Sequence, residues 1–94
     1  PAALERYADC AKAMGVADSA ESDQAAVGRL IEALEAINVE LAVPTPAAYG
    51  ITRERWNELI PLMASQALAS GSPGNNPRVP TIDEIAMLYR QAYA

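Results

Sequence analysis

Apolar residues recur along most of the chain at spacings of three and four, which is the period of an α-helix with one buried face. The clearest stripe lies in residues 23–41 and comprises Val27, Leu30, Ile31, Leu34, Ile37 and Leu41. A weaker stripe in residues 3–14 comprises Leu4, Tyr7, Ala8, Ala11 and Met14. No stretch alternates apolar and polar residues at period two, so the pattern predicts helices and no strand.

A third stripe runs through residues 53–69, but Pro61 interrupts it. A proline inside a helix removes a backbone donor and clashes with the carbonyl four residues earlier. We therefore expect a short turn over residues 53–58, a break, and then a longer helix with Pro61 in its first turn.

A fourth helix is expected to begin at Thr81. Thr81 and Glu84 fit a capping box, in which the side chain of each residue accepts a hydrogen bond from the amide of the other. The expected buried face of this helix is Ile82, Ile85, Ala86, Tyr89, Ala92 and Tyr93. Together the stripes predict an all-α protein, a single bundle-like domain over residues 1–94 with four main helices.

Two linkers separate the later helices, residues 42–51 and residues 70–80. The second is long for a connector, and loops of this length are often functional. Two interpretations stay open. It is a plain connector in which Arg78 pairs with a nearby acid, or it lines a pocket made largely by another domain.

Composition excludes several classes of function. The chain has a net charge of -5, and its seven Lys and Arg residues are scattered singly, so no basic stripe offers a nucleic-acid partner. No apolar run approaches the ~20 residues of a membrane span, so no membrane partner is expected. The single cysteine, Cys10, suits a reducing compartment such as the cytoplasm, and we interpret it as a small packing residue on an alanine-rich helix.

Catalytic chemistry has little support in the residues themselves. The sequence contains no histidine and no pair of cysteines, the side chains that usually bind transition metals. Serine and threonine hydroxyls also lack a histidine to activate them. We therefore assign no catalytic, cofactor-binding or metal-binding residue within the chain.

Three groups of segments nevertheless resemble one known family. Residues 41–46 (LAVPTP) with 49–52 (YGIT) are similar to a segment near the end of the iron-containing, metal-dependent alcohol dehydrogenases (group III). The matching closing segments are 75–78 (NNPR), 80–85 (PTIDEI) and 88–93 (LYRQAY), and the matching opening segments are 6–8 (RYA) and 13–16 (AMGV). The resemblance covers nearly the whole chain in order.

The resemblance implies a two-domain parent enzyme. Its N-terminal α/β domain binds NAD(P), and its helical C-terminal domain binds the metal, Fe²⁺ or Zn²⁺, through one aspartate and three histidines. The last of these ligands precedes the matched segment, so the chain corresponds to the end of the helical domain and holds neither cofactor itself. Ser72 and Asn75 are the candidate cleft-lining residues. Many relatives have a cysteine or another residue where Ser72 stands.

The leading interpretation is thus a non-catalytic, cleft-completing part of an NAD(P)-linked alcohol/aldehyde oxidoreductase. The expected partners are the upstream domains of the same polypeptide. A second copy is also expected, through faces that include Leu4, Tyr7, Tyr89 or Tyr93, because a segment without its neighbours exposes apolar surface. The alternative is a stand-alone helical module for protein–protein interaction or dimerisation.

Overall fold

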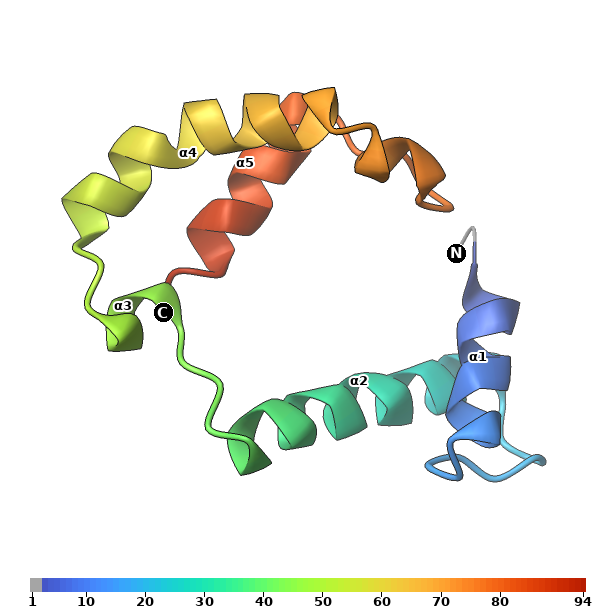
Figure 1. The fold of residues 1–94 in the computed structure, drawn as a ribbon. Helices are drawn as coiled ribbons and strands as arrows, with labels where there is room; N and C mark the ends of the chain where they lie inside the picture. Colours follow the sequence, from blue (N-terminus) through green and yellow to red (C-terminus); the bar gives the residue numbers. More distant parts are fainter. Residues whose placement is uncertain (1–2) are drawn as a thin grey trace. The chain divides into compact units, whose positions relative to one another are not determined.

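The computed structural model describes residues 3–94, in which the chain forms helices and no strand (Figure 1). The elements are α1 (Leu4–Ala13), α2 (Asp23–Glu40), α3 (Pro46–Tyr49), α4 (Arg53–Ala69), the 3₁₀-helix η1 (Ser72–Asn75) and α5 (Ile82–Gln91). The prediction of an all-α protein with four main helices is confirmed. The helices form two compact units, and the boundary between the units along the chain falls between Val43 and Pro44. The single domain stays a prediction.

The first unit is a pair of helices, α1 against α2, held together mainly by small side chains. Its core consists of Ala8, Ala11, Ala26 and Leu30. Alanine lets two helix backbones approach closely but buries little area, so this core contributes modestly to stability. One ion pair joins the two helices, since Lys12 near the end of α1 lies 3.8 Å from Asp23 at the start of α2. A second pair lies between α2 and the loop before it, where Arg29 is 2.6 Å from Glu21.

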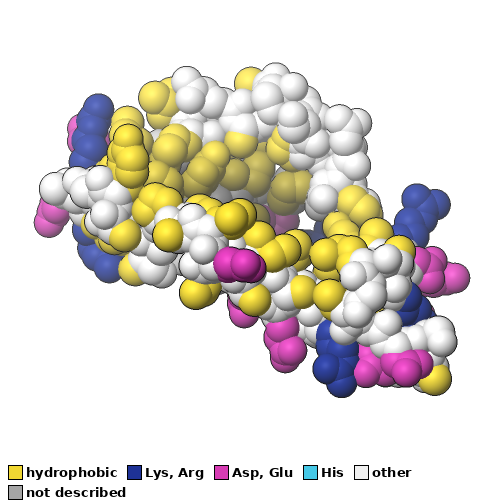
Figure 2. Space-filling view, turned by 60° about the horizontal axis from the view of Figure 1, so that its bottom comes forward, with side chains coloured by type: hydrophobic (Ala, Val, Ile, Leu, Met, Phe, Trp, Pro, Cys, Tyr) yellow, Lys and Arg dark blue, Asp and Glu magenta, His cyan; other side chains and the backbone are white. Residues whose placement is uncertain are grey.

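The apolar stripe of α2 is covered over only part of its length. Leu30 is buried, but the later residues of the stripe, Ile31, Leu34, Ile37 and Leu41, are between 41% and 69% exposed. The reason is length, because α1 has 10 residues and α2 has 18. Many hydrophobic side chains accordingly remain visible at the surface in Figure 2.

Cys10 is exposed, so its interpretation as a packing residue was wrong. Successive residues of an α-helix are rotated by about 100°. The buried face of α1 is centred on Ala8 and Ala11, and Cys10 lies about 130° around the helix from that centre.

The second unit pairs α4 with α5, and its buried side chains are Ile60, Ala64, Ile85 and Tyr93. Both helices begin at a threonine cap. The Thr52 hydroxyl accepts a hydrogen bond from the Arg55 amide at 3.2 Å. The predicted capping box at Thr81 and Glu84 is present in full, so the expected start of α5 is confirmed.

The predicted break near Pro61 is absent, because α4 is one continuous helix from Arg53 to Ala69. Pro61 and Asn57, whose carbonyl loses its usual amide partner, both lie on the exposed side of α4, where water can hydrate that carbonyl. On the inner side Ile60 and Ala64 are each 1% exposed. Their packing holds the helix through the proline.

An aromatic cluster fixes the C-terminal end of α5 to the start of α4. The Trp56 indole N–H donates to the Tyr89 carbonyl oxygen at 2.8 Å, and the two rings meet edge to face with centroids 6.0 Å apart. The Tyr93 hydroxyl donates to the Ile51 carbonyl oxygen at 2.8 Å, and the Ala47 amide donates to the Tyr93 carbonyl oxygen at 3.0 Å. These bonds tie the short helix α3 and both long helices together.

Removing the Tyr93 hydroxyl tests this arrangement. Tyr93→Phe keeps the ring but leaves the Ile51 carbonyl without its donor, and we expect the free energy of unfolding to fall by about 1 kcal/mol. The matched control is Tyr49→Phe, since Tyr49 is 76% exposed. We expect that control to change stability by less than about 0.5 kcal/mol in urea denaturation followed by circular dichroism. Equal effects of the two variants would contradict the assignment.

Candidate functional site

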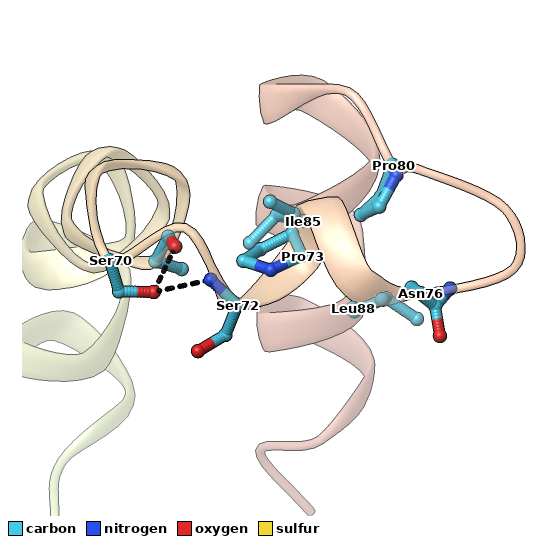
Figure 3. A pocket seen from close by; sticks show the side chains of 8 residues that line it. Ser70, Ser72, Pro73, Asn76, Pro80, Ile85 and Leu88 are labelled. Carbon is cyan, nitrogen blue, oxygen red and sulfur yellow. Dashed lines mark hydrogen bonds between the residues drawn. The ribbon is translucent and has the colours of Figure 1, made fainter.

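An open pocket of about 450 Å³ lies in the second unit, where the end of α4, the 3₁₀-helix η1 and α5 meet (Figure 3). Its lining residues are Ala67, Ser70, Ser72, Pro73, Asn76, Pro80, Ile85 and Leu88. Five of these eight are alanine, proline, isoleucine or leucine, so the pocket offers mainly apolar surface with three small polar side chains.

The turn after α4 places η1 beside the pocket. The Ser70 hydroxyl donates to the Ala67 carbonyl oxygen at 2.6 Å and accepts from the Ser72 amide at 3.3 Å (Figure 3). Gly71 takes a left-handed conformation with φ 79°, which glycine adopts without strain. The chain therefore turns sharply after α4 and presents Ser72 and Pro73 to the pocket.

The polar groups of the pocket are mostly used within the loop itself. The Ser70 hydroxyl makes the two bonds of the turn, and the Asn76 side-chain amide donates to the Arg78 carbonyl oxygen at 2.5 Å. The Ser72 hydroxyl makes no hydrogen bond to any residue that the structure describes. Of the three polar lining side chains, Ser72 is thus the one whose hydroxyl has no partner among the described residues.

The structure places the two sequence-predicted site residues differently. Ser72 lines the pocket, whereas Asn75 is the last residue of η1 and is not among the lining residues. The next residue, Asn76, leaves the 3₁₀-helix with extended backbone and does line it. The cleft implied by the family resemblance includes parts outside this chain, so a role for Ser72 and Asn75 in that cleft stays a prediction.

Sequence reasoning did not assign Asn76, Ile85 or Leu88 to a site. Ile85 belongs to the expected buried face of α5 and looked like ordinary core, and Leu88 fell outside that stripe. The available signal was the asparagine pair with its following proline, which marks a turn but does not say which asparagine faces inward.

The Glu84 carboxylate makes both a hydrogen bond and an ion pair with residues of the loop that borders the pocket. It accepts a hydrogen bond from the Thr81 backbone amide at 2.8 Å and pairs with the Arg78 guanidinium. The Thr81 N–H, followed by the Arg78 side chain, lowers the pKa of Glu84 below its ordinary value near 4.5. The interpretation that Arg78 pairs with a nearby acid is confirmed.

The described residues do not fit a metal site. Within residues 3–94, no three histidine, cysteine, aspartate or glutamate side chains come together in a way that could hold a metal ion. The donor set of this chain therefore supports no reaction step through a metal. None of the helices described in this range combines the length and the hydropathy that a membrane crossing requires.

Comparison with known proteins identifies the class of protein. Residues 1–93 match the Fe-containing alcohol dehydrogenase family, C-terminal. The chain belongs to this family, and it corresponds to the family's C-terminal part.

Individual relatives are similar over nearly the whole chain. The chain is 33% identical over 90 residues to a lactaldehyde reductase of Escherichia coli, which covers 95% of the chain. It is 36% identical over 80 residues to a 1-propanol dehydrogenase of Citrobacter freundii, which covers 84% of the chain, and 29% identical over 91 residues to an NADPH-dependent butanol dehydrogenase of Clostridium saccharobutylicum, which covers 96%. The chain spans only 22% to 23% of the length of these relatives. No solved structure gives a significant match.

The capping carboxylate predicts a specific response to acid. Because the pKa of Glu84 is lower in the folded chain than in the unfolded chain, its stabilising effect is complete above about pH 5 and is lost as the pH falls through the folded value. Glu84→Gln should therefore have a lower free energy of unfolding than the unmodified chain at about pH 7. The difference between the two free energies should become smaller below about pH 4.5. Urea denaturation across this range measures it.

A control for the loss of one exposed carboxylate is Glu58→Gln, because Glu58 pairs with Arg55 on α4 without capping a helix. The proposed role of the carboxylate would be refuted if the difference in free energy of unfolding between the unmodified chain and Glu84→Gln stayed constant or grew in acid.

Proposed function

We propose that this chain is the C-terminal helical part of a metal-dependent, NAD(P)-linked alcohol dehydrogenase, in which it completes one side of the substrate cleft. The observation that carries the proposal is the pocket around Ser72, in a chain that matches the family's C-terminal part over residues 1–93. The parent enzyme would bind Fe²⁺ or Zn²⁺ and NAD(P) through residues upstream of this chain and act in the cytoplasm.

In this proposal the chain forms one apolar side of the substrate cleft and keeps water away from that side. Pro73, Ile85 and Leu88 supply apolar surface for the hydrocarbon part of a small alcohol or aldehyde. Ser72 also lines the pocket, and rotation of its side chain would let the hydroxyl donate to or accept from an oxygen of the ligand. The relatives named for butanol and 1-propanol support a short aliphatic substrate.

The test compares the 94-residue chain with the full-length reading frame that contains it. We expect the full-length protein, supplied with Fe²⁺ or Zn²⁺, to oxidise 1-butanol with reduction of NAD⁺ or NADP⁺, and the 94-residue chain to show no such turnover. Since the chain has no histidine, calorimetric titration of it with either metal should reveal no stoichiometric micromolar site. An inactive full-length protein, or a tight metal site in the short chain, would overturn the proposal.

We also propose that the 94-residue chain self-associates. The exposed stripe of α2 supports this, because apolar patches on small proteins favour association. Tyr7 is 46% exposed and can contribute, whereas Tyr93 is 8% exposed and cannot, which corrects its place in the expected contact surface.

Charge placed on the α2 stripe should weaken this self-association. Leu34→Glu lies on the stripe, and the matched control Val39→Glu lies about 140° further around the helix. In sedimentation velocity we expect the unmodified chain and Val39→Glu to associate at high micromolar concentration, and Leu34→Glu to shift toward the monomer. A strict monomer in all three would refute self-association.

A further inference from the structure

The two walls of the pocket come from separate parts of the chain. Ser72 and Pro73 belong to η1, whereas Ile85 and Leu88 belong to α5. Residues 77–80 connect the walls and make no backbone–backbone hydrogen bond within the described chain. Two of these four residues are prolines, which have no N–H to donate. The backbone of the connection therefore does not fix the distance between the walls.

Side chains bridge this gap in the backbone hydrogen bonding. The Asn76 amide, at the end of η1, donates to the Arg78 carbonyl oxygen at 2.5 Å. The Arg78 guanidinium then pairs with one carboxylate oxygen of Glu84, in the first turn of α5. The other oxygen of that carboxylate accepts from the Thr81 amide at 2.8 Å. A continuous path of polar contacts thus runs from one wall of the pocket to the other, and Arg78 is its middle member.

We infer that the Arg78–Glu84 pair is a positioning latch that sets the width of the pocket for a short aliphatic alcohol. This inference rests on the proposed dehydrogenase function for the identity of the ligand. Charge recognition of the ligand is not part of the role, because the guanidinium is engaged with Glu84 and neither residue lines the pocket.

Because the pair is exposed, removing Arg78 can change the position of the loop without unfolding the chain. The Arg78 side chain is 71% exposed, so its removal leaves the α4–α5 core intact. An exposed ion pair shifts an equilibrium by about two- to fivefold, so loss of the latch should weaken ligand binding by about that factor while the chain stays folded.

The test titrates 1-butanol into the 94-residue chain and follows the amide signals of Ser72, Asn76 and Ile85 by nuclear magnetic resonance. We expect saturable shifts, and about two- to fivefold weaker binding in Arg78→Met. Arg78→Lys keeps the charge and should restore the affinity. The matched control is Arg55→Met, because Arg55 pairs with Glu58 at 3.0 Å, is also exposed, and does not line the pocket.

Parallel kinetics on the full-length protein separate this inference from the proposed function. Arg78→Met should raise the KM for 1-butanol by the same factor without changing kcat, and Arg78→Lys should reverse the effect. An active enzyme in which Arg78→Met has the unmodified KM overturns the latch and leaves the dehydrogenase function standing. A full-length protein without turnover, alongside weakened 1-butanol binding in the Arg78→Met chain, overturns the dehydrogenase function alone. Absence of saturable shifts in the unmodified chain, or equal affinities in Arg78→Met and Arg55→Met, also refutes the latch.

Discussion

One hydrogen bond between a side chain and a helix end holds the C-terminal half of α5 against the start of α4. The Trp56 indole donates to the Tyr89 carbonyl oxygen, which belongs to the last turn of α5, where carbonyls lack partners within the helix. A single side chain therefore satisfies a polar group at the helix end and buries aromatic surface against it. With the C-terminal half of α5 fixed in this way, the position of its N-terminal half, and so of Ile85 beside the pocket, follows from the straightness of the helix.

The sequence predicted the long helices well because their caps and apolar periods are local signals. The capping box at Thr81 is an example, since four consecutive residues contain all the groups that it needs. Pro61 shows where local signals fail. The rule that proline ends a helix describes an isolated segment, but here the burial of Ile60 and Ala64 outweighs the loss of one backbone hydrogen bond.

The candidate site was harder to predict because its surface comes from residues far apart in the chain. Ser72 was found through the family resemblance, but Ile85 and Leu88 join it only once α5 packs against α4. The apolar stripe in the second half of α2 stays exposed for a related reason. Helical periodicity identifies an apolar face, but it does not say whether a neighbouring element is long enough to cover that face, as α1 is not for α2.

The arrangement of polar groups indicates what this chain would contribute to the proposed enzyme. The hydrogen-bonding groups of Ser70, Asn76 and Glu84 are engaged with the loop and the helix cap, so they stabilise a shape and do not act on a ligand. What this loop presents outward is apolar surface and one hydroxyl, that of Ser72. Such a surface distinguishes ligands by size and hydrophobicity, and a change of one methylene group in a hydrophobic pocket changes binding by only about 1–3 kcal/mol. Within the proposed dehydrogenase, this surface would therefore favour a range of short alcohols over water, and strict recognition of one substrate would require polar contacts from elsewhere in the polypeptide.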